Sequence, residues 1–178
     1  MDNAAEALLP WQIVAVPITH PDAALLVEGV QQEYVVRYGG RDETPLDPTY
    51  FEPPQGAFFV GYLEERPVAT GAWRRRHDVV VDGTDHAAEI KRMYVVPAAR
   101  RRGRARAMLG HLEETAREAG AEVMVLETGL AQPEAIALYE SVGYRPIPGF
   151  GFYKDARLSR CFARRLTGGP ARRESRGG

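Results

Sequence analysis

The sequence of 178 residues has almost no cysteine, no strong excess of either charge and no long apolar segment. Cys161 is alone, which excludes a disulfide framework within the chain and fits a reducing compartment. The net charge of -1 gives no general electrostatic preference for nucleic acid or an anionic membrane. No basic segment leads from Met1 into an apolar run, so we expect neither a signal peptide nor a membrane span, and a cytoplasmic location.

The remaining composition is that of an ordinary globular domain. Hydrophobic residues make up 44% and charged residues 26%, so the chain can bury a core without disulfides or metals. We expect one domain over residues 1–166 and a disordered tail over 167–178, where apolar residues are too few to offset the entropy of ordering. Because the four histidines show no metal-ligand spacing, we predict no metal site.

The first half of the chain is predicted to be rich in strands. A strand over 11–16 and a helix over 18–37 precede a loop that begins at Gly39 and is rich in proline and glycine. Aromatic-rich apolar runs at 57–63 and 67–74 indicate a β-hairpin, and 86–96 continues the sheet.

The second half alternates helices with strands. A helix begins near Arg104 and ends at Gly120, with Ala105, Met108, Leu109, Leu112 and Ala116 on one face. A strand over 122–128, a helix over 133–142 and a terminal strand pair interrupted by prolines follow. This order predicts a mixed α/β fold, a mixed sheet with helices on its faces.

The junction between the strand ending at Val96 and the helix near Arg104 carries an R-x-x-G-x-A pattern formed by Arg100, Gly103 and Ala105. A helix N-terminus offers unpaired backbone N–H groups and the positive end of a dipole, and small residues let a phosphate approach. The pattern therefore indicates a pyrophosphate cradle to which arginines add contacts. The alternative interpretation is a solvated basic patch at a helix start.

This pattern after MYVVP resembles the acetyl-CoA-binding motif of the GCN5-related N-acetyltransferases. Downstream, AIALYESVGY resembles the second signature of that superfamily, a helix with Leu-Tyr followed by Gly-Tyr. The resemblance covers roughly residues 57–153. It implies a V-shaped mixed sheet with acetyl-CoA, the cosubstrate, in the cleft.

The resemblance also implies which residues bind the cofactor. The strand backbone before the loop pairs with the pantetheine arm in relatives, the loop holds the pyrophosphate, and Gln132 stands where many relatives have asparagine. The implied cofactor contacts are Met93, Val95, Arg100, Arg101, Arg102, Gly103, Arg104, Ala105, Arg106 and Gln132.

Two residues are catalytic candidates by the same resemblance. Glu89 lies eleven residues before Arg100, where many relatives place a glutamate, and shares the period-2 parity of Met93 and Val95, so we predict it as the general base. Tyr139 is the candidate acid for the leaving thiolate. The alternatives are a strand carboxylate paired with a neighbouring cation and a tyrosine that only packs in the core.

The acceptor amine is expected opposite the cofactor, over the first helix, its loop and the terminal strands. Carboxylates suit a cationic amine, whereas the tyrosines of the first helix could simply pack it against the sheet. The predicted acceptor contacts are Tyr34, Tyr38, Asp42, Glu43, Trp73, Glu127 and Tyr153.

The function predicted from these residues is acetyl transfer from acetyl-CoA to the amine of a small molecule or a protein, with no nucleic-acid or membrane partner. Two alternatives stay open: a non-catalytic acyl-CoA-binding domain and a nucleic-acid-binding module using the arginine run. The resemblance also allows a homodimer, because many relatives dimerise through terminal strands.

Overall fold

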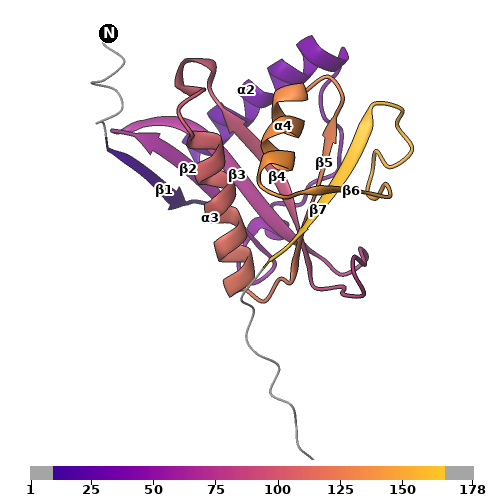
Figure 1. The fold of residues 1–178 in the computed structure, drawn as a ribbon. Coiled ribbons are helices and arrows are strands. Elements are labelled where there is room, and N and C mark those ends of the chain that lie inside the picture. Colours follow the sequence, from indigo (N-terminus) through magenta and orange to yellow (C-terminus); the bar gives the residue numbers. More distant parts are fainter. Residues whose placement is uncertain (1–9, 167–178) are drawn as a thin grey trace, which may run out of the picture.

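The computed structural model describes residues 10–166 and contains one seven-stranded sheet with helices on both faces (Figure 1). In chain order its elements are β1 (Trp11–Ala15), α2 (Pro21–Tyr38), the 3-10 helix η1 (Pro48–Phe51), β2 (Gly56–Leu63), β3 (Arg66–Arg76), β4 (Ala87–Val95), the 3-10 helix η2 (Pro97–Ala99), α3 (Arg104–Glu118), β5 (Val123–Gly129), α4 (Pro133–Ser141), β6 (Arg145–Ile147) and β7 (Ser159–Arg165). The mixed α/β fold class and the order of elements expected from the sequence are confirmed. The proposed tail at 167–178 lies outside the described residues.

The strands follow the order β1-β2-β3-β4-β5-β7-β6. Every neighbouring pair is antiparallel except β4 and β5, which are parallel and are joined through α3. This single crossover divides the sheet into an amino-terminal meander and a carboxyl-terminal group of three strands.

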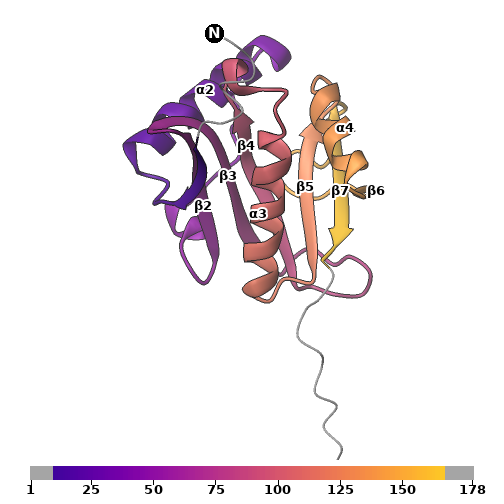
Figure 2. The ribbon, with the colours of Figure 1, turned by 60° about the vertical axis from the view of Figure 1, so that its left-hand side comes forward.

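Helices cover the two faces unequally (Figure 2). The apolar stripe of α3, with Met108, Leu109 and Leu112 fully buried, and Tyr139 of α4 pack into the larger core on one face. On the other face, Ala23 and Leu26 of α2 pack against β2 and β3 in a smaller core. Burial of these apolar side chains is the main force that holds the helices on the sheet.

The boundaries of α2 follow from its end residues. The His20 side chain accepts a hydrogen bond from the Asp22 backbone N–H at 3.1 Å, and Pro21 occupies the first turn, where no N–H is needed. Gly39 ends the helix in the left-handed conformation at φ 77°. The last turns of α2 and the loop that follows this stop line the cavity described below.

The parallel strands β4 and β5 are paired over only part of their length. Residues 87–89 pair with residues 123–125, and we call these the closed half of the pair. Beyond them the strands separate toward their carboxyl ends (Figure 1), and residues 90–95 and 126–129 form the open half. The open half leaves one edge of each strand without a partner strand from the other.

A β-bulge in β4 changes the direction in which its side chains point. Lys91 pairs with Ala72 and Tyr94 with Thr70, so Arg92 and Met93 together oppose Gly71, and Arg92 has φ 54°. One extra residue reverses the alternation along a strand. Glu89 therefore does not share a face with Met93 and Val95, which pack in the larger core, and the parity prediction was wrong.

Residues 10–166 contain no candidate membrane span and no candidate metal cluster. None of the helices there is both long and apolar enough to cross a membrane. No group of three or more His, Cys, Asp or Glu side chains in this range is arranged to hold a metal ion.

Candidate active site

The loop before α3 turns its backbone toward the open half of the β4–β5 pair. Arg101 and Gly103 both have positive φ, 62° and 72°, and no side chain caps the helix that begins at Arg104. Alternation of left-handed with ordinary residues gathers backbone N–H groups into an anion-binding concavity. The first N–H groups of α3 have no partner within the helix, so this loop has the donors that a pyrophosphate requires.

The side chains of two arginines at this loop bind other groups of the protein instead of pointing toward a ligand. Arg100 donates from Nε to the Val95 carbonyl at 2.8 Å and pairs with Glu33 of α2 at 2.5 Å. Arg104 is buried and donates to the Ala99 carbonyl at 3.0 Å. Their side chains therefore fix the loop, and the cradle consists chiefly of backbone groups.

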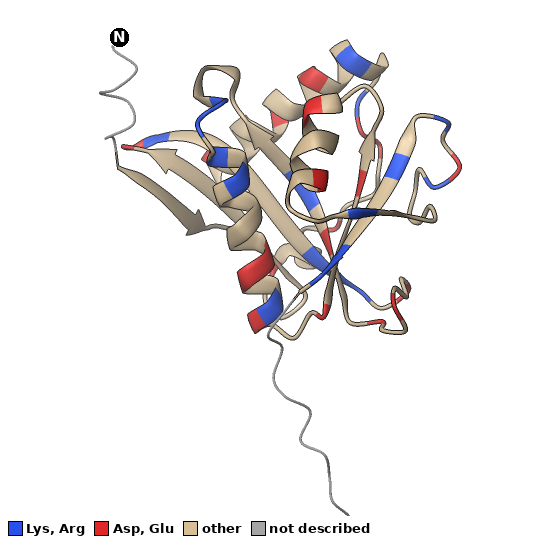
Figure 3. Ribbon diagram, in the orientation of Figure 1, with Lys and Arg blue, Asp and Glu red and all other residues tan. Residues whose placement is uncertain are grey.

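The other predicted phosphate contacts lie at the surface. Basic residues cluster at the amino-terminal end of α3 (Figure 3). Arg101 and Arg106 are exposed, and Arg106 donates to Ser141 Oγ at 2.9 Å, which ties α3 to α4. Arg102 and Ala105 are partly buried beside them.

The other half of the site is a cavity of about 560 Å³ on the side of α2. Four segments distant in sequence form it: the end of α2, the loop that follows, the end of β5 with the start of α4, and the loop before β7. The structure brings six of the seven predicted acceptor residues together here, namely Tyr34, Tyr38, Asp42, Glu43, Glu127 and Tyr153.

Trp73 is the seventh predicted acceptor residue and does not line this cavity. Its side chain is 4% exposed within the larger core, and its Nε1 donates to Thr115 Oγ1 of α3 at 3.0 Å. The alternation along β3 places Trp73 beneath α3, on the face opposite Arg74. Its polar atom is satisfied within the core, and its placement is that of a packing residue.

Glu89 lies in the closed half and is enclosed by cations. Arg74 Nε and Arg76 Nη1 reach its Oε2 at 2.8 and 2.6 Å, and its side chain is 3% exposed. Burial alone would raise the pKa of Glu89, but the charges of Lys91, Arg74 and Arg76 outweigh burial and lower it. A carboxylate held in this way is a weak proton acceptor and a strong anchor for the two arginines.

Glu127 lies two residues beyond Val125, the last residue of β5 that pairs with β4, and therefore belongs to the open half. It lines the cavity, and burial raises the pKa of its carboxyl group, an effect that the charge of Lys91 opposes only in part. Cys161 Sγ lies 3.9 Å from its Oε2, on the side of β7. Glu127 therefore combines access to the cavity with the raised pKa that a general base needs.

Tyr139 and Tyr34 lie on opposite faces of the sheet. Tyr139 belongs to α4 and the larger core, whereas Tyr34 belongs to α2 and the cavity. Burial raises the pKa of both phenols, that of Tyr34 to about 12, and the charge of Tyr34 adds to the shift of Tyr139. Both hydroxyls are therefore protonated at neutral pH.

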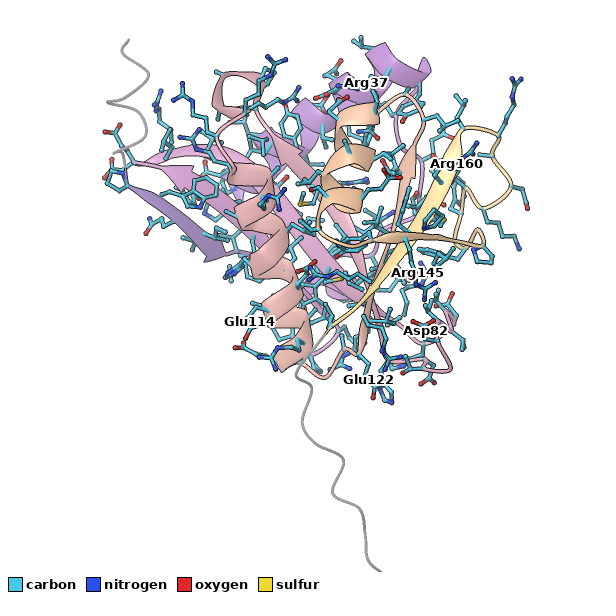
Figure 4. The ribbon with its side chains drawn as sticks, in the orientation of Figure 1. Arg37, Asp82, Glu114, Glu122, Arg145 and Arg160 are labelled. Atoms are coloured by element: carbon cyan, nitrogen blue, oxygen red, sulfur yellow. The ribbon has the colours of Figure 1, made fainter. Side chains whose placement is uncertain are left out.

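Contacts between α2 and α4 hold this junction together. Tyr38 donates to Gln132 Oε1 at 3.3 Å, so Gln132, predicted from the resemblance as a cofactor contact, also borders the cavity. Arg37, which is labelled in Figure 4, donates to the Ala131 carbonyl at 2.7 Å and pairs with Glu134. The helix that carries the cavity tyrosines is thus fixed to the start of α4.

Arg92 was not predicted as a site residue. Its guanidinium is buried and pairs with Asp42 Oδ2 at 2.5 Å, while its Nε has no hydrogen-bond partner. Burial alone would raise the pKa of Asp42, but hydrogen bonds from Thr44 and the charge of Arg92 lower it to about 2. The pair connects the β4 bulge to the cavity wall, and only the bulge, which the sequence does not reveal, directs Arg92 there.

The loop before β7 completes the cavity with residues that sequence reasoning missed. Arg157, Leu158 and Ser159 line it together with Arg41 and Thr128. These residues carry no motif, and the proline and glycine residues around 146–151 predicted an irregular segment without indicating its contacts.

Comparison with known proteins agrees with this geometry. The model of the acetyltransferase (GNAT) family matches residues 27–144. An IAA acetyltransferase of Azospirillum brasilense is 31% identical over 134 residues, which cover 75% of this chain and 84% of that protein.

Solved structures share the fold. A Klebsiella pneumoniae protein assigned as an acyl-CoA N-acyltransferase matches with a TM-score of 0.68 and 25% identity, over 90% of this chain and 99% of that one. A GNAT-family acetyltransferase of Staphylococcus aureus matches with a TM-score of 0.67 and 17% identity, over 88% and 99% of the two chains.

Proposed function

The chain belongs to the acetyltransferase (GNAT) family, and from this premise we propose that it transfers an acetyl group from acetyl-CoA to a primary amine. Members of this family take acetyl-CoA or another acyl-CoA. The observation that carries the proposal is the meeting of an uncapped helix start with a carboxylate-bearing cavity at the open half of the β4–β5 pair.

The cradle suits the anionic end of acetyl-CoA. The first N–H groups of α3 and the left-handed residues Arg101 and Gly103 present donors to a pyrophosphate. The free edge of β4 at Met93 can pair with the amides of the pantetheine arm, as an added strand would. This pairing would place the thioester at the open half, where we propose that Tyr139 serves as the acid.

The cavity suits the amine. A protonated amine is attracted to Glu127, which lies at the floor where β4 and β5 separate. Because the pKa of Glu127 is raised, its carboxylate can accept a proton from the ammonium more readily than an ordinary glutamate. We therefore assign the general base to Glu127, and we assign to Glu89 the positioning of Arg74 and Arg76.

The proposed reaction is a direct transfer. The ammonium passes a proton to Glu127, and the amine nitrogen then attacks the thioester carbonyl carbon to form the C–N bond. The C–S bond breaks, and the leaving thiolate takes a proton from the Tyr139 hydroxyl, whose high pKa keeps it protonated until then. The nitrogen, which carries a positive charge after the attack, releases its second proton, and this proton restores the Tyr139 hydroxyl. The products are the N-acetylated amine and free CoA.

Titration calorimetry with acetyl-CoA, followed on the same sample by a thiol-release assay with primary amines, tests the proposal. Micromolar binding with thiol release that depends on the amine is the expected result. Binding without release for any amine would identify a non-catalytic acyl-CoA-binding protein, and absence of binding would contradict the cradle assignment.

A further inference from the structure

The two long walls of the cavity are joined to each other. The Glu43 backbone N–H donates to the Tyr153 hydroxyl at 2.8 Å, across 110 positions of sequence, and that hydroxyl also interacts with the Asp42 carboxylate. One partner belongs to the loop after α2 and the other to the loop before β7, and both loops line the cavity. The hydrogen bond therefore closes a side on which a polypeptide would have to pass between the loops.

Side chains of other elements hold the loop after α2, which forms one wall of the cavity. The Gln31 side chain is buried and binds the Asp42 backbone twice, accepting from its N–H at 2.8 Å and donating to its carbonyl at 3.3 Å. Arg92 pairs with the Asp42 carboxylate, which also accepts hydrogen bonds from Thr44. The loop is thus tethered from α2, from β4 and, through Tyr153, from the loop before β7, which favours a preformed cavity over an adaptable groove.

The lining determines the kind of molecule that fits. Asp42 is neutralised by Arg92, and Arg41 is held by Glu28 at 2.8 Å. Glu43 and Arg157 also line the cavity but are exposed, so the more enclosed charge left for an acceptor is that of Glu127. The rings of Tyr34, Tyr38 and Tyr153 line the same cavity and offer apolar faces that also attract cations. A volume of about 560 Å³ lies within the range of cavities that enclose small ligands.

We infer that the acceptor is a small free primary amine with an aromatic body, and that polypeptide amines are excluded by the Glu43–Tyr153 bridge. This inference rests on the proposed function. The ammonium group of the acceptor pairs with Glu127, and the aromatic body of the acceptor lies among the three tyrosines, beneath the Glu43–Tyr153 hydrogen bond.

Competition kinetics with a saturating amount of acetyl-CoA test this acceptor class. Tyramine and phenethylamine are compared with spermidine, an alanine-initiated hexapeptide and an N-blocked lysine hexapeptide. We expect kcat/KM for the aromatic amines to exceed that for either peptide by about 100-fold, the scale on which a fitted pocket discriminates. Peptides acetylated as fast as tyramine, or spermidine preferred over it, would overturn the inference.

A pair of substitutions distinguishes loss of the Glu43–Tyr153 hydrogen bond from a general effect on folding. Tyr153→Phe should lower the ratio of kcat/KM for tyramine to kcat/KM for the hexapeptides about 3- to 10-fold, the equivalent of one hydrogen bond, without changing the KM for acetyl-CoA. Tyr62→Phe removes a tyrosine hydrogen bond to Asp22 remote from the cavity and should change neither quantity. An unchanged ratio in Tyr153→Phe would contradict the role of the bridge.

Failure of the inference is distinguishable from failure of the proposed function. Calorimetry on the same sample reports acetyl-CoA binding independently of any acceptor. Acetyl-CoA binding with acetylation of the other amines but not of the aromatic amines would overturn the inference alone. Absence of acetyl-CoA binding would overturn the proposed function, and the inference with it.

Discussion

The closed and open halves of the β4–β5 pair use similar residues for opposite purposes. In the closed half the strands satisfy each other's backbone, and Glu89 is neutralised by two arginines at 2.8 and 2.6 Å. In the open half each strand keeps a free edge, and Glu127 faces a cavity with a raised pKa. Two glutamates on adjacent strands thus differ because one lies before the point of separation and the other lies beyond it.

The difference shows where this fold places chemistry. Where the two strands pair, their backbone N–H and C=O groups are already hydrogen-bonded. A side-chain charge buried there must also have a partner, because unsatisfied buried groups are costly. Separation leaves backbone donors for one ligand and a carboxylate for the other within a few residues. We propose accordingly that the closed half supports stability and that the open half supports binding and catalysis.

Replacing the carboxylate of the open half should have the largest effect. Glu127→Gln keeps the shape of the side chain but removes the general base, so kcat should fall by about 10²- to 10⁴-fold. Acetyl-CoA affinity, measured by calorimetry, should not change. Glu140→Gln on the exposed side of α4 is the matched control and should keep the wild-type kcat.

The pH dependence sharpens this prediction. A base acts when ionised, so wild-type activity should rise with pH through the pKa of Glu127, which lies above its ordinary value of 4.5. The same limb should be missing from the pH profile of Glu127→Gln with the same amine. A mutant profile that keeps this limb would assign the base to another residue.

Replacing the carboxylate of the closed half should mainly affect folding. Glu89→Gln leaves Arg74 and Arg76 with an uncharged partner in the interior, which should lower the free energy of unfolding by about 3 kcal/mol in urea denaturation. Asp78→Asn removes the exposed partner of Arg76 and should cost about 0.5 kcal/mol or less.

Because the pKa of Glu89 is lowered, its contribution to the free energy of unfolding depends on pH. Because folding lowers its pKa, the contribution of Glu89 is present above the unfolded value, about 4.5, and is lost as pH falls below it. Glu89→Gln should therefore flatten the acid limb of a plot of stability against pH. An unaltered acid limb would contradict the anchoring role.

Acetyl-CoA binding should depend more on the backbone conformation of the loop before α3 than on the arginine side chains of that loop. Gly103 has φ 72°, and alanine there costs about 1 kcal/mol or more, so Gly103→Ala should raise the Kd for acetyl-CoA about 10-fold. Gly110→Ala in the middle of the same helix has open space around it and should leave the Kd unchanged. An equal Kd in both variants would place the phosphates elsewhere.

The smallest effect is expected at the end of β5. A Cβ on Gly129 would lie 2.0 Å from the Tyr38 hydroxyl, which would have to turn away from Gln132. Gly129→Ala should therefore raise the acceptor KM about 3-fold, the equivalent of a weak hydrogen bond, with acetyl-CoA binding retained. Tyr38→Phe should reproduce this KM if the lost hydrogen bond is the cause.

Local patterns predicted much of this molecule. The helix stop at Gly39, the helix start at Pro133 and the strand–loop–helix junction at Gly103 depend on nearby residues and were readable from the sequence. The first helix begins at Pro21, three residues later than predicted, although Pro21 was expected in its first turn. The helical face of α3 also followed from its spacing, because one stripe of apolar side chains must meet the sheet.

What the sequence could not reveal depends on contacts between distant segments. The bulge at Arg92 reversed the side-chain alternation of β4, and no local signal distinguishes it from an ordinary strand. Trp73 looked like an acceptor contact because nothing in its neighbourhood indicates which face of β3 the large helix covers. The different environments of Glu89 and Glu127 likewise depend on the residue at which two strands separate.

Amide hydrogen exchange with and without acetyl-CoA is the most direct test of the claim that the open half and the start of α3 form the cofactor site. We predict that residues 91–96 and 101–106 exchange more slowly when acetyl-CoA is present, because their backbone N–H groups gain partners. The closed half at 87–89 and 123–125 is already paired and should keep its rates. Unchanged exchange in residues 101–106 at saturating acetyl-CoA would contradict the account.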